Sequence, residues 1–107
     1  MDTRQLYING QWVDSTGAAR IAVENPATEE VIAMIPAGTE ADAIRALGSA
    51  QAAQPAWAAL PAIERATRLQ KLADLVVRDR DALAQVITAE QGKPLRESCE
   101  ELGGTEI

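Results

Sequence analysis

The sequence is most informative in what it lacks. Its 107 residues contain no histidine, no phenylalanine, one cysteine, and three aromatic side chains in all. Without histidine the commonest general acid and base of enzymes is missing. A lone Cys99 excludes an internal disulfide and fits a reducing compartment. With so few aromatic residues, alanine fills much of the interior, which favours closely packed helices over a thick sandwich core.

Positive charge is also scarce. Ten Lys and Arg face sixteen Asp and Glu, for a net charge of −6. An acidic chain repels phosphate, so we expect no nucleic-acid partner, and no basic amphipathic face is present for a membrane surface. No apolar run approaches the ~20 residues that a membrane span needs, and the opening Met1–Gln5 lacks the features of a secretory signal. We therefore expect a cytoplasmic protein.

Residues 1–38 carry strand patterns. Asn9-Gly10 lies between two short runs rich in aromatic and β-branched residues, which predicts a hairpin with a type I′ turn. A second strand pair is predicted from Ile21–Val23 and Val31–Ile35, joined by an Asn-Pro turn. The nearly continuous apolar character of Val31–Ile35 predicts burial on both of its faces.

Residues 39–107 carry helical patterns. Thr39 is predicted to cap the first helix, with Glu40 and Asp42 near the positive end of the helix dipole. Pro55 is predicted to end that helix. Three further helices are predicted, opening at Pro61, covering 79–91, and running from Pro94 to about Leu102, with Gly92 in the left-handed conformation after the third.

The predicted fold class is therefore α/β, locally α+β-like, with hairpins followed by about four helices and no strand–helix–strand crossover. Four stretches of this arrangement resemble, in order and spacing, the opening segment of the aldehyde dehydrogenase superfamily: Leu6–Val13, Glu24–Ile32, Arg65–Arg80 and Glu90–Leu95. The last stretch is similar to the succinate-semialdehyde dehydrogenase branch. The resemblance implies that segments 1–38 and 39–107 both belong to one incomplete domain, the opening part of the cofactor-binding domain.

The resemblance also implies a chemistry. The family oxidises aldehydes to carboxylic acids with NAD or NADP, through a cysteine thioester that a glutamate-activated water hydrolyses. In the family these groups lie beyond the stretch matched here, and the sequence has no Gly-rich phosphate turn between a strand and a helix. We therefore expect no catalytic and no cofactor-binding residue in this chain, and no activity from the chain alone.

Two residues mimic catalytic groups. Cys99 is interpreted as a small side chain packed on the fourth helix, with nothing nearby to depress its pKa. Glu101 precedes Leu-Gly-Gly, as the family's general base does, but it follows Glu90–Leu95 at once, whereas the family places that motif far downstream. Chance similarity explains it best, and an internal deletion is the alternative. Lys93 is interpreted as a surface lysine near a helix C-terminus.

One family site carries over to this chain. The resemblance implies a structural monovalent cation held by the Glu90 carboxylate and by backbone carbonyls at Val23 or Glu24, completed by a later segment. Hard cations take oxygen ligands, which these positions supply. The alternative is that Glu90 is a solvated acid near a helix end.

Two functional hypotheses follow. In the first, the chain is a structural part of a homo-oligomeric dehydrogenase, and its partner is the remainder of that chain. In the second, it is a naturally short, non-catalytic module that self-associates or binds a partner through apolar surfaces such as Val31–Ile35.

Overall fold

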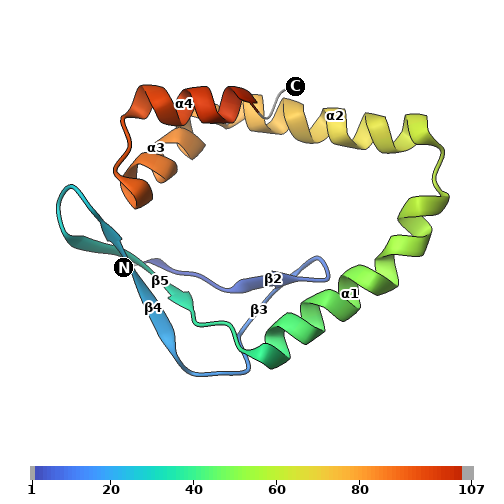
Figure 1. Cartoon of the computed structure of the whole chain (residues 1–107), viewed down its shortest axis with the longest axis horizontal. Helices are drawn as coiled ribbons and strands as arrows, with labels where there is room; N and C mark the ends of the chain where they lie inside the picture. The colour runs from blue at the N-terminus through green and yellow to red at the C-terminus, as the bar shows by residue number, and fades with distance from the viewer. Residues whose placement is uncertain (1, 105–107) are drawn as a thin grey trace. The chain divides into compact units, whose positions relative to one another are not determined.

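A computed structural model describes residues 2–104, with side chains from residue 4 onward. The chain divides into two compact units. The strand unit contains the chain up to Glu24 together with Val31–Ala59, and the helix unit contains Asn25–Glu30 together with the chain from Leu60 onward. Within residues 2–104 every strand precedes every helix, so no helix connects two strands. Figure 1 shows this order along the chain.

A three-stranded sheet lies in the strand unit, in the order β1-β5-β4. Its strands are β1 (Asp2–Thr3), β4 (Arg20–Asn25) and β5 (Glu30–Pro36). The strand pair β4 and β5 confirms the second predicted pair, whereas the parallel pairing of β1 with β5 was not predicted. The side chains of β5 from Ile32 on are half-buried and Val31 is exposed, so the predicted burial on both faces is wrong for the described residues.

The predicted hairpin is confirmed. Strands β2 (Leu6–Ile8) and β3 (Gln11–Val13) pair antiparallel. Asn9 and Gly10 have φ of 54° and 74°, as a type I′ turn requires. Tyr7 and Trp12 lie directly opposite each other, with ring centroids 4.9 Å apart. A tilted aromatic pair of this kind holds the two short strands in register.

Helix α1 (Glu40–Ala59) completes the strand unit. It continues through Pro55, so the predicted end at that residue is wrong. Proline keeps a helical φ and removes only the one N–H that would bond the carbonyl four residues earlier. Because only four residues follow Pro55 in α1, the helix loses little by continuing.

The helix unit contains the other three predicted helices. They are α2 (Ala62–Arg78), α3 (Arg80–Gln91) and α4 (Leu95–Gly103). Helices α3 and α4 pack against each other, and the hydroxyls of Thr88 and the fully buried Ser98 lie 2.8 Å apart across that contact. Ala84 of α3 is also fully buried. Gly92 ends α3 in the left-handed conformation, as predicted, and its N–H donates to the Thr88 carbonyl.

Helix α2 presents much apolar side chain to solvent. Ile63, Leu69 and Leu72 are each more than half exposed. Charged residues interrupt this surface, and none of the helices in the described part of the chain is long and apolar enough to cross a membrane.

Candidate functional site

The most buried charged group described is the carboxylate of Asp42, in the first turn of α1, which is 3% exposed. Three donors surround it. The Ser15 hydroxyl donates to it at 2.5 Å, and the backbone N–H groups of Thr16 and Thr39 each donate at 3.0 Å. One carboxylate thus joins the loop after β3 to the start of the helix.

Thr39 and Asp42 also cap α1 reciprocally. The Thr39 hydroxyl accepts from the Asp42 N–H at 3.2 Å, while the Asp42 carboxylate accepts from the Thr39 N–H. This is the arrangement of a capping box, with Asp in place of the usual Glu or Gln. The predicted cap at Thr39 is confirmed. The Thr39-x-x-Asp42 spacing could have indicated the reciprocal bond, but nothing local indicated Ser15 and Thr16, which lie 27 and 26 residues earlier.

These hydrogen bonds determine the protonation state of Asp42. The bond from Ser15, followed by those from the Thr39 and Thr16 N–H groups, holds the pKa of Asp42 well below its ordinary value, although burial opposes the shift. A carboxyl group so strongly acidic stays ionised near neutral pH and cannot exchange protons there as a general acid or base. Asp42 is therefore a structural carboxylate.

We expect Asp42 to make folding sensitive to acid. Its pKa is lower in the folded than in the unfolded chain, so its stabilising contribution is complete above the unfolded value of about 4 and is lost as pH falls toward the folded value. In Asp42→Asn this loss should disappear, and the urea midpoint should fall less steeply below about pH 5 than in the unmodified chain. Parallel slopes for the two proteins in urea titrations followed by circular dichroism would contradict this.

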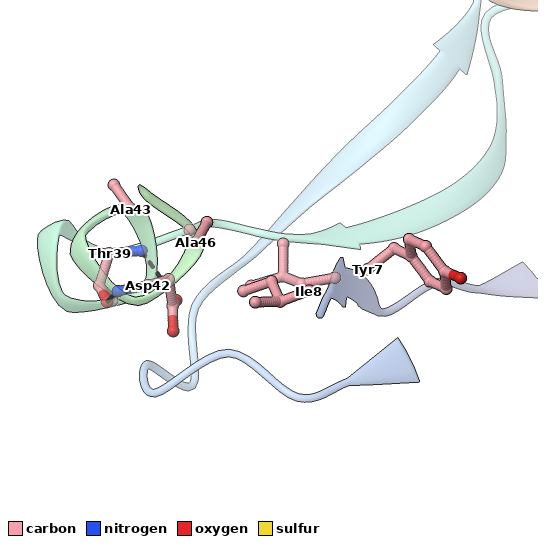
Figure 2. Close-up of a pocket in the computed structure, with 8 residues that line it drawn as sticks. Tyr7, Ile8, Thr39, Asp42, Ala43 and Ala46 are labelled. Atoms are coloured by element: carbon pink, nitrogen blue, oxygen red, sulfur yellow. Dashed lines mark hydrogen bonds between the residues drawn. The ribbon is translucent and has the colours of Figure 1, made fainter. Parts of the chain in front are cut away.

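An apolar pocket of about 340 Å³ lies between β2 and the start of α1 (Figure 2). It is lined by Leu6, Tyr7, Ile8, Gly38, Thr39, Asp42, Ala43 and Ala46. Its main polar groups, on Thr39 and Asp42, already bond each other and the loop at Ser15 and Thr16. Substrate pockets use a few convergent polar groups to orient a ligand. Those of this pocket are occupied, so the arrangement does not resemble an active site.

In the helix unit, the turn after β4 meets the end of α3. The Asn25 side chain accepts from the Ala27 N–H at 2.9 Å, and the Asn25 carbonyl accepts from the Glu29 N–H at 2.8 Å. These bonds fix the turn with Pro26 against Gly92. A Cβ on Gly92 would lie 2.6 Å from Pro26 Cγ, so only glycine fits at this approach.

The three predicted cation ligands lie in different units. Val23, half-buried, and Glu24, exposed, belong to β4 of the strand unit, and Glu90 is exposed near the end of α3 in the helix unit. Among residues 2–104 no three His, Cys, Asp or Glu side chains gather as a metal site. The predicted site relies chiefly on backbone carbonyls, which that observation does not address. It stays a prediction.

The two residues that mimic catalytic groups have structural neighbours. Cys99 is half-buried on α4, and its carbonyl accepts a hydrogen bond from the Arg80 guanidinium at 3.0 Å. Glu101 forms an ion pair with Lys93. That ion pair ties the start of the 93–104 segment to α4 and gives the Glu101 carboxylate a structural use.

Comparison with known proteins gives a consistent result. The sequence profile of the aldehyde dehydrogenase family matches residues 12–106. The chain is 44% identical over 99 residues to the glutarate-semialdehyde dehydrogenase of Pseudomonas putida, covering 92% of this chain and 21% of that protein. It is 42% identical over 96 residues to the 3,6-anhydro-alpha-L-galactose dehydrogenase of a Vibrio species, covering 90% and 20%.

Solved structures agree. Lactaldehyde dehydrogenase from Escherichia coli superposes with a TM-score of 0.93 at 41% identity, over 97% of this chain and 22% of that one. Succinate-semialdehyde dehydrogenase from Burkholderia pseudomallei superposes with a TM-score of 0.89 at 40% identity, over 94% and 21%. The chain thus spans about a fifth of the length of the relatives that it matches.

Proposed function

The chain belongs to the aldehyde dehydrogenase family, and on that premise we propose that it is the structural amino-terminal portion of an enzyme that oxidises an aldehyde to a carboxylic acid with NAD or NADP. The observation that supports this most directly is the unequal coverage: nearly all of this chain aligns with about a fifth of each relative. The chemistry of the parent needs a nucleophile, a general base and an oxyanion site. In this proposal those groups lie in the other four fifths.

The cofactor belongs to the parent and not to this chain. One similar structure, a 3,6-anhydro-L-galactose dehydrogenase, is a complex with NAP, and another, of a putative methylmalonate-semialdehyde dehydrogenase from Sinorhizobium meliloti, is a complex with NAD. A dinucleotide phosphate usually binds free N–H groups at a helix N-terminus. At α1 the Thr39 N–H already donates to Asp42, whose negative charge repels phosphate. The described residues therefore do not fit a dinucleotide, and we assign them no step with it.

We expect the isolated 107-residue chain neither to bind nucleotide nor to oxidise aldehydes. Titration calorimetry with NAD⁺ and with NADP⁺ should give only heats of dilution, and aldehydes should cause no rise in absorbance from reduced nucleotide. Saturable heat with the isolated chain would contradict the assignment of the cofactor to the rest of the protein.

The matching positive control is the natural product that carries these residues. Its intact mass should be several times the 11.4 kDa of this chain, and it should reduce NAD⁺ or NADP⁺ when given an aldehyde. Light scattering on the same product tests the homo-oligomeric assembly that we propose for the parent, and cell fractionation tests its cytoplasmic location. A long product that is inactive with both nucleotides would overturn the proposed function.

A further inference from the structure

The pocket between β2 and α1 has apolar walls contributed by two elements. Leu6 and Ile8 come from β2, and Ala43 and Ala46 come from the first turns of α1 (Figure 2). Its volume of about 340 Å³ far exceeds the roughly 30 Å³ that one liquid water molecule occupies. The pocket therefore has room for whole side chains.

The chemistry of the pocket selects an apolar occupant. The Asp42 carboxylate is saturated by Ser15, Thr16 and Thr39, and the Thr39 hydroxyl is bonded to Asp42 and Thr16. A polar ligand entering here would lose its hydration and gain few hydrogen bonds in return. An apolar group would lose nothing and would bury the walls.

The apolar surface continues beyond the pocket. Leu47 lies one helical turn after Ala43, on the same side of α1, and is 69% exposed. Tyr7, which lines the pocket, is itself 62% exposed. A small molecule would fill the pocket and leave these side chains in water. A polypeptide segment would cover both, and large contiguous apolar patches on soluble proteins usually mark such contacts.

The unequal coverage identifies the polypeptide. About four fifths of each relative's length has no counterpart in this chain, whereas a second copy would bring another net charge of −6 to the contact. Resting on the proposed function, we infer that the pocket is a socket for apolar side chains from the part of the dehydrogenase polypeptide that lies outside these residues.

Thiol labelling tests this inference. The cysteine introduced by Ala46→Cys lies in the pocket wall, and the one introduced by Ala52→Cys lies on a different, exposed side of α1. Both variants are made in the 107-residue chain and in the full natural product, and N-ethylmaleimide labelling at each position is followed by peptide mass mapping. We expect Ala46→Cys to react at least about tenfold more slowly in the full product than in the 107-residue chain, and Ala52→Cys to react alike in both.

Three outcomes overturn the inference. One is equal labelling of Ala46→Cys in both proteins. Another is protection that appears in the 107-residue chain as its concentration rises, which would make a second copy the occupant. The third is a natural product of 11.4 kDa, which leaves no further polypeptide to dock. Aldehyde oxidation by the same full product is assayed separately, so protection without activity would retain the socket and remove the proposed function.

Discussion

Gly92→Ala should destabilise the 107-residue chain by about 2–5 kcal/mol, the largest effect we expect from any single methyl group. Gly92 has φ of +76°, where a side chain adds backbone strain of roughly 1–2 kcal/mol. The new Cβ would also lie 2.6 Å from Pro26 Cγ, and such overpacking adds about 1–3 kcal/mol. Neither end of the contact can yield easily, because one is backbone and the other is a ring held in a hydrogen-bonded turn. Urea unfolding measures the change.

Gly10→Ala is the matched control. Gly10 has nearly the same φ, +74°, but no atom lies within 4 Å of the position of a Cβ there. It should lose only the backbone part, about 1–2 kcal/mol. Adding Pro26→Ala to Gly92→Ala should restore part of the difference, and a double-mutant cycle isolates that coupling. Equal losses at the two glycines, with no coupling to Pro26, would show that the close approach is unimportant.

Asp42→Ala should have the second large effect. It leaves the Ser15 hydroxyl and the N–H groups of Thr16 and Thr39 without their acceptor, in a place that little water reaches. Buried donors without partners are among the most destabilising defects of a fold. We expect the thermal midpoint to fall by several degrees, and Asp42→Asn, which keeps one carbonyl acceptor, to fall by less.

The control for Asp42 is Asp74→Ala on α2. Asp74 is exposed and accepts one hydrogen bond, from the Gln70 side chain at 3.1 Å, so its loss should change the midpoint little. Amide exchange localises the effect: in Asp42→Ala the Thr16 and Thr39 N–H groups should exchange faster, while the N–H of Gly92 in the helix unit should not change. If both aspartates behave alike, Asp42 does not hold the loop to the helix.

The sequence predicts those features that a few neighbouring residues determine. Asn9-Gly10 requires two positive φ angles in a row, and few turns satisfy that. Gly92 follows a helical stripe and precedes Pro94, which together specify a left-handed end to α3. In both cases the determining residues lie within a few positions of one another, so the structure confirms them.

The features that sequence reasoning missed depend on long-range contacts or on a balance of small terms. The Asp42 hydrogen bonds reach back 26 and 27 residues to a loop whose own sequence indicates only a turn. The β1 strand of two residues forms only because β5 offers it a parallel edge. Pro55 was given too much weight, since its penalty falls on one bond near the end of a twenty-residue helix.

The candidate sites show the same division. The pocket joins a strand and a helix that are more than thirty residues apart, and no local pattern indicates such a surface. The cation site at Val23, Glu24 and Glu90 came from family resemblance alone. Its residues belong to two units, and the resemblance places its last ligands outside this chain, so it remains a prediction.

The turn Asn25–Glu30 has a consequence for how this protein can be dissected. It belongs to the helix unit, yet the chain on either side of it belongs to the strand unit. Cutting between Ala59 and Leu60, the obvious boundary for cloning two pieces, would leave the turn on the wrong fragment and remove Pro26 from its place against Gly92. Neither unit is therefore available as one uninterrupted gene segment, and any attempt to express the helices alone must supply this turn as a separate peptide.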